Sequence, residues 1–424
     1  MKIDLDLLNK KLMPPLRSVL DKLYSISEEL GIELYLAGGT VRDLILNRET
    51  IDLDFLIDSR LDEFSKSVES RFEVNVDETS FLTAKFILEG FDVDIARARK
   101  EIYQYPGALP DVSPAALEED IRRRDFTINT LILKVKNGKF AELIDYLGGF
   151  DDLKRGVIRV MHPKSFYDDP TRIIRAVRYK MRFNFAFDKQ TSAQLKEAVE
   201  QDVFSTLSVQ RLGAEFLRTL KEENAVRPVA MLWQLGMEYA LFHDVELTEE
   251  KTALLKKWDK LKKNSKLKYP WMLSLMIILK DASSNQINLI AGALELRKDQ
   301  RKIITEFENM DAAELLNSIS KRLSKVEIYD KLNNFDLYAI LYLYLISRGK
   351  AKNNLRFYID KISKIALEIT GEDVKKLGVP ECPYVGDVLS KVLRAKIEGR
   401  IKNREEETDY LKKLLSKGDV DRLP

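Results

Sequence analysis

The sequence predicts a mixed α/β head followed by a long, all-helical body, and two observations support this fold class. Alternation of apolar and polar residues, which is typical of strands, is concentrated before residue 150. From Asp169 onward, apolar residues recur at helical spacing, with few glycines and sparse prolines. A chain of 424 residues is too long for one hydrophobic core, so we expect about three domains.

Composition narrows the class of protein. No run of about 18 apolar residues occurs, so we expect no membrane-spanning helix. Acidic Asp4 lies where a signal peptide needs an apolar run, which predicts a cytoplasmic protein. The single cysteine, Cys382, excludes an intramolecular disulfide framework and a cysteine-rich zinc site. A net charge of +2 gives no global field that would indicate a nucleic-acid partner.

Several segments of the head have the alternation expected of strands. Two of them, Thr83–Leu88 and Phe91–Ala96, are joined by Glu89-Gly90, which predicts a hairpin with a two-residue turn. The stretch 97–116 is polar and contains Pro106-Gly107, which predicts a long loop. The expected strands are Leu34–Ala37, Asp52–Ile57, Thr83–Leu88, Phe91–Ala96 and Leu131–Val135, and the expected helices after them include Pro170–Phe183, Thr191–Gln201, Val209–Lys221 and Ala225–Leu235.

A glycine turn separates the first of these strands from a short helix. Gly38 and Gly39 follow the apolar run 32–37, and apolar residues then recur at helical spacing. Two glycines before a helix let backbone N–H groups approach an anion, and Arg42 adds a fixed positive charge. The turn therefore has the composition of a site for the phosphates of a nucleoside triphosphate.

Carboxylates follow the turn at strand spacing. Alternation places Asp52 and Asp54 on one side of a strand, where hard oxygen ligands suit Mg2+ alongside phosphate oxygens. A third acid is available in the hairpin, where Asp92 and Asp94 share one face. Three carboxylates holding two magnesium ions can activate a 3′-hydroxyl and neutralise a leaving pyrophosphate. The alternative is that these aspartates are only solvent-exposed charges on an edge strand. The preceding glycine turn favours the metal site over this alternative.

A basic cluster precedes Asp125. Arg122, Arg123 and Arg124 have the composition of a surface salt-bridge cluster, but the apolar residues that follow predict a segment packed into the head. That packing would direct part of the basic run at the cleft. Such a cluster suits a triphosphate, and Asp125 would be free to accept from a ribose hydroxyl.

A third motif begins at Asp169. Pro170 suits the first position of a helix, so Asp169 is a natural N-cap, which is the structural alternative. On the helix, Asp169 and Arg172 are close enough at i and i+3 to work as a pair, with Arg175 and Arg178 along the same side. A carboxylate acceptor beside a guanidinium donor matches the amino group and ring nitrogen that cytosine and adenine present. A pair of this kind selects C and A without a nucleic-acid template.

Together these motifs resemble the class II tRNA nucleotidyltransferases, the CCA-adding enzymes, whose superfamily includes bacterial poly(A) polymerases. The resemblance covers roughly residues 30–220. It implies an α+β head, a nucleotidyltransferase palm with a small mixed sheet, followed by an all-α neck, body and tail. The implied domains are a head at 1–150, a neck with base recognition at 151–222, a body at 223–345 and a tail that binds tRNA at 346–424.

Carried over by position, the resemblance assigns roles to individual residues. It implies magnesium binding by Asp52 and Asp54, with Asp94 where the family usually has its third acid. Arg211 and Glu215 resemble a pair that steadies the base-reading helix, and 146–149 resembles a flexible segment that lets the head move. The implied nucleotide contacts are Gly38, Gly39, Arg42, Arg124, Asp125, Asp169, Arg172, Arg175 and Arg178.

The activity implied is template-independent addition of CCA, or part of it, to tRNA 3′ ends from CTP and ATP. The stretch 97–119 has the full length that CC-only members lack, which favours use of adenosine. Three alternatives stay open: an A-only or CC-only enzyme, a poly(A) polymerase acting on general RNA, and a catalytically silent RNA-binding scaffold. The intact Asp52 and Asp54 argue against a scaffold. His162 and His243 are too few for the phosphohydrolase site of some family members, so we interpret His243 as structural.

Overall fold

The computed structural model describes residues 3–10, 12–48, 52–102, 104, 110–379 and 383–416. Cys382 and the Pro106-Gly107 pair lie outside these ranges. The chain divides into two compact units, Met1–Asp244 and Val245–Pro424. The finer division at residues 150, 222 and 345 stays a prediction. No helix within the described ranges combines the length and the apolar character needed to cross a membrane.

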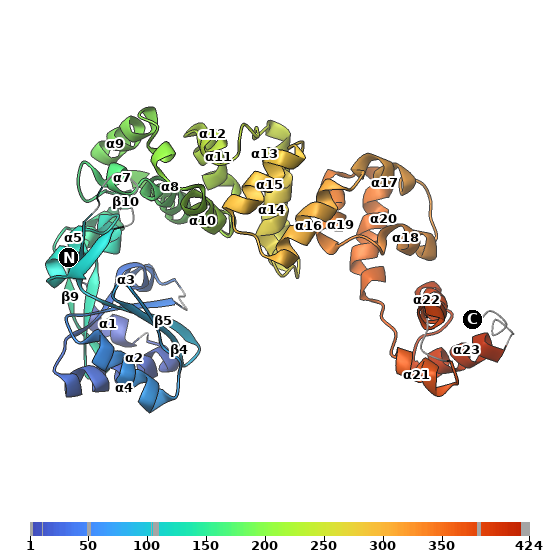
Figure 1. Ribbon diagram of the computed structural model, residues 1–424, viewed down its shortest axis with the longest axis horizontal. Helices are drawn as coiled ribbons and strands as arrows, with labels where there is room; N and C mark the ends of the chain where they lie inside the picture. Colours follow the sequence, from blue (N-terminus) through green and yellow to red (C-terminus); the bar gives the residue numbers. More distant parts are fainter. Residues whose placement is uncertain are drawn as a thin grey trace. The chain divides into compact units, whose positions relative to one another are not determined.

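The first unit is built on a seven-stranded mixed sheet of order β3-β4-β5-β2-β1-β8-β9 (Figure 1). Strand β2 runs parallel to β5, and the other neighbouring pairs are antiparallel. The strands are β1 Leu34–Ala37, β2 Asp52–Ile57, β3 Asp77–Thr79, β4 Thr83–Leu88, β5 Phe91–Arg97, β8 Ile132–Lys136 and β9 Lys139–Ile144. The mixed sheet and the helices that follow it confirm the predicted fold class.

Helices α2 (Pro14–Leu30) and α4 (Leu61–Phe72) pack against this sheet and against each other. Helix α2 begins at two prolines, whose fixed φ suits a first turn, and ends at Gly31 in the left-handed conformation. The hairpin of β4 and β5 has the predicted two-residue connection, with Leu88 paired to Phe91. Alternate residues of β4 and β5 are buried, so the other residues of each strand form a continuous exposed face.

The predicted loop at 97–116 is wrong in part, because its two ends pair with each other. Strand β6 (Arg99–Ile102) runs antiparallel to β7 (Asp111–Pro114), and Arg99 lies opposite Pro114. Proline is tolerated there because a two-stranded ribbon has edges on both sides. The ribbon leads into helix α5 (Leu117–Arg122), which carries the first residue of the arginine cluster.

The predicted flexible segment 146–149 is held by local contacts. The Asp145 carboxylate accepts hydrogen bonds from the backbone N–H groups of Gly149 at 2.9 Å and Phe150 at 3.0 Å. These bonds satisfy the first two backbone N–H groups of helix α6 (Gly149–Arg155). A Cβ on Gly149 would lie 2.1 Å from the carbonyl oxygen of Thr127, so the backbones approach too closely for any other residue.

Helices continue the first unit after the sheet. Helix α8 (Thr171–Phe183) buries Ile173, Ile174 and Val177, and it packs on α10 (Val209–Leu220) and α11 (Val226–Gln234). Two two-residue strands, β10 (Val157–Ile158) and β11 (Ala186–Phe187), were not predicted. The remaining helices of this unit are α1 Leu5–Lys10, α3 Gly38–Ile45, α7 Ser165–Asp168, α9 Lys189–Glu200 and α12 Met237–Ala240.

Among its described residues, the regular elements of the second unit are all helices. Its helices α14 (Pro270–Ile278) and α19 (Leu337–Ile346) are apolar on every side and largely buried, as expected for the centre of a helical core. The other helices are α13 Glu249–Leu261, α15 Ser284–Ala293, α16 Lys298–Glu308, α17 Ala312–Ser318, α18 Lys325–Leu332, α20 Gly349–Asp360, α21 Gly371–Lys376, α22 Pro383–Glu398 and α23 Arg404–Ser416.

Candidate functional site

A cavity of about 1310 Å³ opens in the first unit between the exposed face of the sheet and the start of helix α8. Its size exceeds the roughly 300–1000 Å³ of most small-molecule pockets, which leaves space for a nucleotide and the end of a second chain. Of the predicted site residues, those that line it are Gly38, Gly39, Asp52, Asp54, Asp92, Asp94, Arg124, Asp125, Asp169, Arg172, Arg175 and Arg178.

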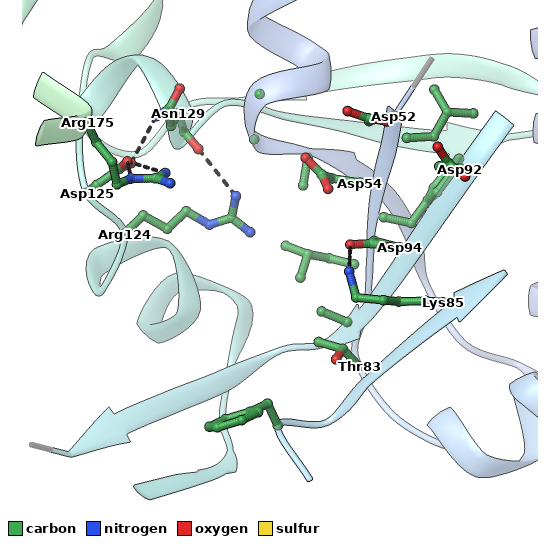
Figure 2. Close-up of a pocket in the computed structure, with 18 of the residues that line it drawn as sticks. Asp52, Asp54, Thr83, Lys85, Asp92, Asp94, Arg124, Asp125, Asn129 and Arg175 are labelled. Atoms are coloured by element: carbon green, nitrogen blue, oxygen red, sulfur yellow. Dashed lines mark hydrogen bonds and ion pairs between the residues drawn. The ribbon is translucent and has the colours of Figure 1, made fainter. Parts of the chain in front are cut away.

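Four carboxylates form one wall of this cavity (Figure 2). The parallel register of β2 and β5 places Asp52 beside Asp92 and Asp54 beside Asp94. Asp52 and Asp92 are exposed, whereas Asp54 and Asp94 are half-buried. The hydroxyl of Thr40 accepts a hydrogen bond from the Asp54 backbone N–H at 3.0 Å and donates one to the Asp52 carbonyl at 3.1 Å. Thr40 thus fixes the glycine turn against the acidic strand.

The charge of this wall fits a divalent cation. Burial raises the pKa of Asp54, the Arg124 charge opposes that effect, and the carboxylates of Asp94 and Asp52 raise the pKa further. A cation between Asp52 and Asp54 would relieve this repulsion. Within the described ranges, no group of three or more His, Cys, Asp or Glu side chains stands ready to hold a metal ion. Two carboxylates completed by phosphate oxygens and water are nevertheless a usual magnesium environment.

Arg124 faces the acids from the opposite side of the cavity. Its guanidinium donates to the Asp120 carboxylate at 3.0 Å and to the Asn129 carbonyl at 3.3 Å. Asp120 is fully buried, and its pKa is lowered because the charges of Arg124 and Arg123 outweigh the effect of burial. Gly38 adopts a φ of +65°, and a Cβ there would lie 2.9 Å from an Arg124 nitrogen. The turn therefore brings its backbone directly against this guanidinium.

Asp125 is not free to accept from a ribose, contrary to the prediction. It is buried, and its carboxylate accepts from Arg175 at 2.6 and 2.8 Å and from the Asn129 side chain at 2.9 Å. Burial alone would raise the pKa of Asp125, but the Arg175 charge and these hydrogen bonds lower it to about 2. The reason for the error is the neighbouring helix α8, which supplies a cation 50 residues later in the chain.

Arg42 lies behind the glycine turn, with only 3 % of its surface exposed. It donates to Asn129 Oδ1 at 2.5 Å and forms a two-point ion pair with Asp43. Its guanidinium carbon lies 5.0 Å from the ring centre of Tyr179 and 4.6 Å from that of Phe183. These contacts support a structural role that joins the turn to α8, rather than the predicted contact with a nucleotide.

The predicted base-reading residues both reach the cavity, and separate partners hold them. The Asp169 carboxylate accepts from the Thr171 backbone at 3.1 Å and from Arg211 at 2.9 Å. The first contact is a cap for α8, so the two interpretations of Asp169 are compatible. Arg172 is buried and donates to the Ser165 hydroxyl at 2.7 Å and to the Arg123 carbonyl at 2.9 Å.

Further along α8, Arg178 is buried and forms an ion pair with Glu215 at 2.8 Å. Burial raises the pKa of Glu215, but the charges of Arg178, Arg175 and Arg218 lower it overall. Arg175 lies 3.9 Å from the same carboxylate. Arg211 of α10 therefore holds Asp169, just before α8, and Glu215 of α10 holds Arg178 on α8, which is the arrangement that the predicted steadying pair requires.

Sequence reasoning missed four residues of this site: Lys85, Asp120, Asn129 and Ser165. Lys85 had a usable signal, because the predicted two-residue turn sets the hairpin register that places it opposite Asp94. Asp120 is a helical turn before Arg124, a spacing typical of ion pairs. Ser165 and Asn129 gave no comparable signal, since neither side chain carries a charge and Arg42, which donates to Asn129, lies 87 residues away.

Part of the first unit is similar to a known family of proteins. Residues 34–159 match the family described as Poly A polymerase head domain. The segment includes the glycine turn, the four carboxylates and the arginine cluster. This part of the chain is therefore similar to the head domain of that family.

Two relatives are similar to this chain over nearly its whole length. The chain is 29% identical over 417 residues to the A-adding tRNA nucleotidyltransferase of Geobacter sulfurreducens, covering 95% of this chain and 47% of the relative. The chain thus spans about half the length of that relative. The A-adding tRNA nucleotidyltransferase of Halalkalibacterium halodurans is 26% identical, with 97% of this chain and 96% of the relative covered.

A solved structure of the Thermotoga maritima CCA-adding enzyme, complexed with tRNA-CCA, has a TM-score of 0.69 and 27% identity to this chain. The match covers 98% of this chain and all of that one. The comparisons confirm the expected resemblance to tRNA nucleotidyltransferases, and they extend it beyond residue 220, where the sequence motifs end.

Proposed function

We propose that this chain is a tRNA nucleotidyltransferase that adds CCA, or part of it, to tRNA 3′ ends from CTP and ATP and releases pyrophosphate. One observation carries the proposal: a single cavity has carboxylates on one wall and the Asp169 and Arg172 side chains on the other. The first wall suits phosphoryl transfer, and the second suits selection of a base. The names of the relatives support tRNA as the acceptor.

The acidic wall is the proposed catalytic centre. Asp52 and Asp54 would hold magnesium, which supplies activation of the 3′-hydroxyl and neutralisation of pyrophosphate. Gly38 and Gly39 present the turn to the triphosphate, and Arg124 lies across the cavity from the acids, where its charge would bind phosphate oxygens. Asp120 holds Arg124 at 3.0 Å, so the cation is oriented before the nucleotide binds.

The second wall is the proposed base-selecting edge. Asp169 would accept from the exocyclic amino group and Arg172 would donate to the ring nitrogen of cytosine or adenine. Bonds from Arg172 to Ser165 and the Arg123 carbonyl fix its orientation, and Arg211 does the same for Asp169. Uracil and guanine present the opposite polarity at these positions, so they would meet repulsion as well as lost bonds.

The experiment that tests this proposal uses three tRNA substrates, which lack one, two or three terminal nucleotides. Each is incubated with the full-length protein, magnesium and each of the four nucleoside triphosphates, and the products are resolved at single-nucleotide resolution. We expect CTP or ATP to be incorporated, and neither UTP nor GTP. Extension of an unrelated RNA as readily as tRNA would instead indicate a poly(A) polymerase, and no extension of any substrate would refute transfer.

Addition of the terminal adenosine alone is the second candidate, because the relatives from Geobacter sulfurreducens and Halalkalibacterium halodurans are named A-adding enzymes. The same experiment separates it from full CCA addition. An A-adding enzyme extends only the tRNA that lacks one nucleotide, and it uses ATP alone. A CCA-adding enzyme extends all three substrates.

A further inference from the structure

One basic residue stands within the acidic wall and has no role in the account above. Lys85 of β4 pairs in register with Asp94 of β5, and Asp94 pairs in register with Asp54 of β2. Neighbouring strands lie about 4.8 Å apart, so these three side chains form one row across the sheet. Figure 2 shows Lys85 extending along this row to the Asp94 carboxylate.

Lys85 forms an ion pair with Asp94 through its ammonium group. The side chains are 54% and 42% exposed, so the pair is open to solvent and to ions. By contrast, Asp54 lies deeper in the wall, and its backbone is fixed by Thr40. The two candidates for the third metal ligand, Asp92 and Asp94, therefore differ. Asp94 already has a counter-ion, whereas Asp92 is exposed at the end of the wall.

We infer that Lys85 is a positioning residue that acts as the built-in counter-ion of Asp94 and keeps this carboxylate from binding a second divalent ion before the nucleotide arrives. The inference rests on the proposed magnesium site at Asp52 and Asp54. A lysine ammonium bonded to one oxygen of Asp94 would compete with a second ion for this carboxylate, and its charge repels any ion approaching the row. The free protein then binds one divalent ion, and the second must come with the triphosphate.

The alternative is a pair without consequence for metal binding, since solvent-exposed ion pairs usually contribute little to stability. The two interpretations differ in a measurable way. If the ion pair is only a surface contact, replacing Lys85 would leave metal binding unchanged. A counter-ion for Asp94 would release a ligand, so metal binding would become tighter and gain an ion.

The experiment measures Mn2+ binding to the full-length, nucleotide-free protein by electron paramagnetic resonance of the unbound ion. We expect one tight ion in the wild-type protein, and its loss in Asp52→Asn or Asp54→Asn. Lys85→Met should bind a second ion, or bind with an affinity about tenfold higher, because one opposing charge is removed. Lys85→Arg is the matched control and should behave as the wild type. In the Lys85→Met background, Asp94→Asn should return binding to one ion.

Three results separate failure of this inference from failure of the proposed function. Unchanged number and affinity of ions in Lys85→Met, with binding still dependent on Asp54, would overturn the inference alone. The inference would also be overturned if the wild-type protein bound two ions and Asp94→Asn bound only one, since Asp94 would then already be a ligand. Absence of any binding that depends on Asp52 or Asp54 would overturn both the inference and the proposed magnesium site.

Discussion

Replacement of Gly38 by alanine separates the backbone of the glycine turn from its contact with Arg124. Gly38 has a φ of +65°, and its added Cβ would lie 2.9 Å from the Arg124 guanidinium and 3.8 Å from Asp54 Oδ2. The left-handed conformation costs an alanine about 1–2 kcal/mol of stability. The close contact is with the end of a flexible side chain, so Arg124 would move aside with little further loss. A hydrogen bond to a charged group contributes about 1.5–3 kcal/mol, so we expect ATP and CTP to bind about 10–100-fold more weakly.

Gly31 offers a matched control, because it has the same φ of +65° and nothing within 4 Å of an added Cβ. Thermal unfolding should show similar losses for Gly31→Ala and Gly38→Ala, whereas calorimetric titration with ATP should show weaker binding in Gly38→Ala alone. Equal nucleotide affinities in the two variants would refute the reasoning. They would mean that Arg124, although it lies against the turn, has no part in holding the triphosphate.

Three further predictions concern the acids. Asp54→Ala should lower nucleotide incorporation by more than about 10³-fold and leave tRNA binding in a filter assay unchanged, because it removes a magnesium ligand; near-normal incorporation would contradict the assignment. Asp169→Ala should relax discrimination against UTP and GTP in competition assays. If Asp169 only caps α8, its replacement would instead cost about 1 kcal/mol of stability, seen as a lower melting temperature, and base preference would be unchanged. Asp125 has a folded-state pKa of about 2, against 3.8 for an ordinary aspartate, so its contribution is complete above about pH 4 and is lost as the pH falls toward 2. In Asp125→Asn, the free energy of unfolding of the first unit should therefore fall by about 2 kcal/mol less than in the wild type as the pH is lowered. Urea unfolding measured from pH 5 downward checks this, and an unchanged pH dependence would count against the ion pair with Arg175.

Local patterns predicted the head well because its elements depend on neighbours in the sequence. Alternation identified β1 and β2, and the two-residue turn between β4 and β5 followed from Glu89-Gly90. The ribbon of β6 and β7 was missed since its strands are short, polar and separated by a proline-rich stretch. Such strands carry no apolar alternation, so only the pairing itself reveals them.

The candidate site was predicted by residue type, but its pairings were not. Sequence spacing indicates which face a side chain occupies, and it does not indicate what covers that face. Asp125 illustrates this: its partner Arg175 lies 50 residues away, on a helix that packs over it. Arg42 likewise meets Asn129 from 87 residues away, and its guanidinium lies near the rings of Tyr179 and Phe183 on α8. Roles that depend on long-range packing therefore required the structure.

The parallel register of β2 and β5 also bears on how the head folds. A slip of one residue in either strand would turn its two aspartates toward the interior and present Leu53 or Val93, both fully buried here, to water. Burying two unpaired carboxylates is far more costly than a misplaced apolar side chain. The same charges that would attract a metal thus penalise misaligned sheets during folding. Substituting all four by asparagine should consequently weaken this penalty and leave a head that tolerates misalignment more readily.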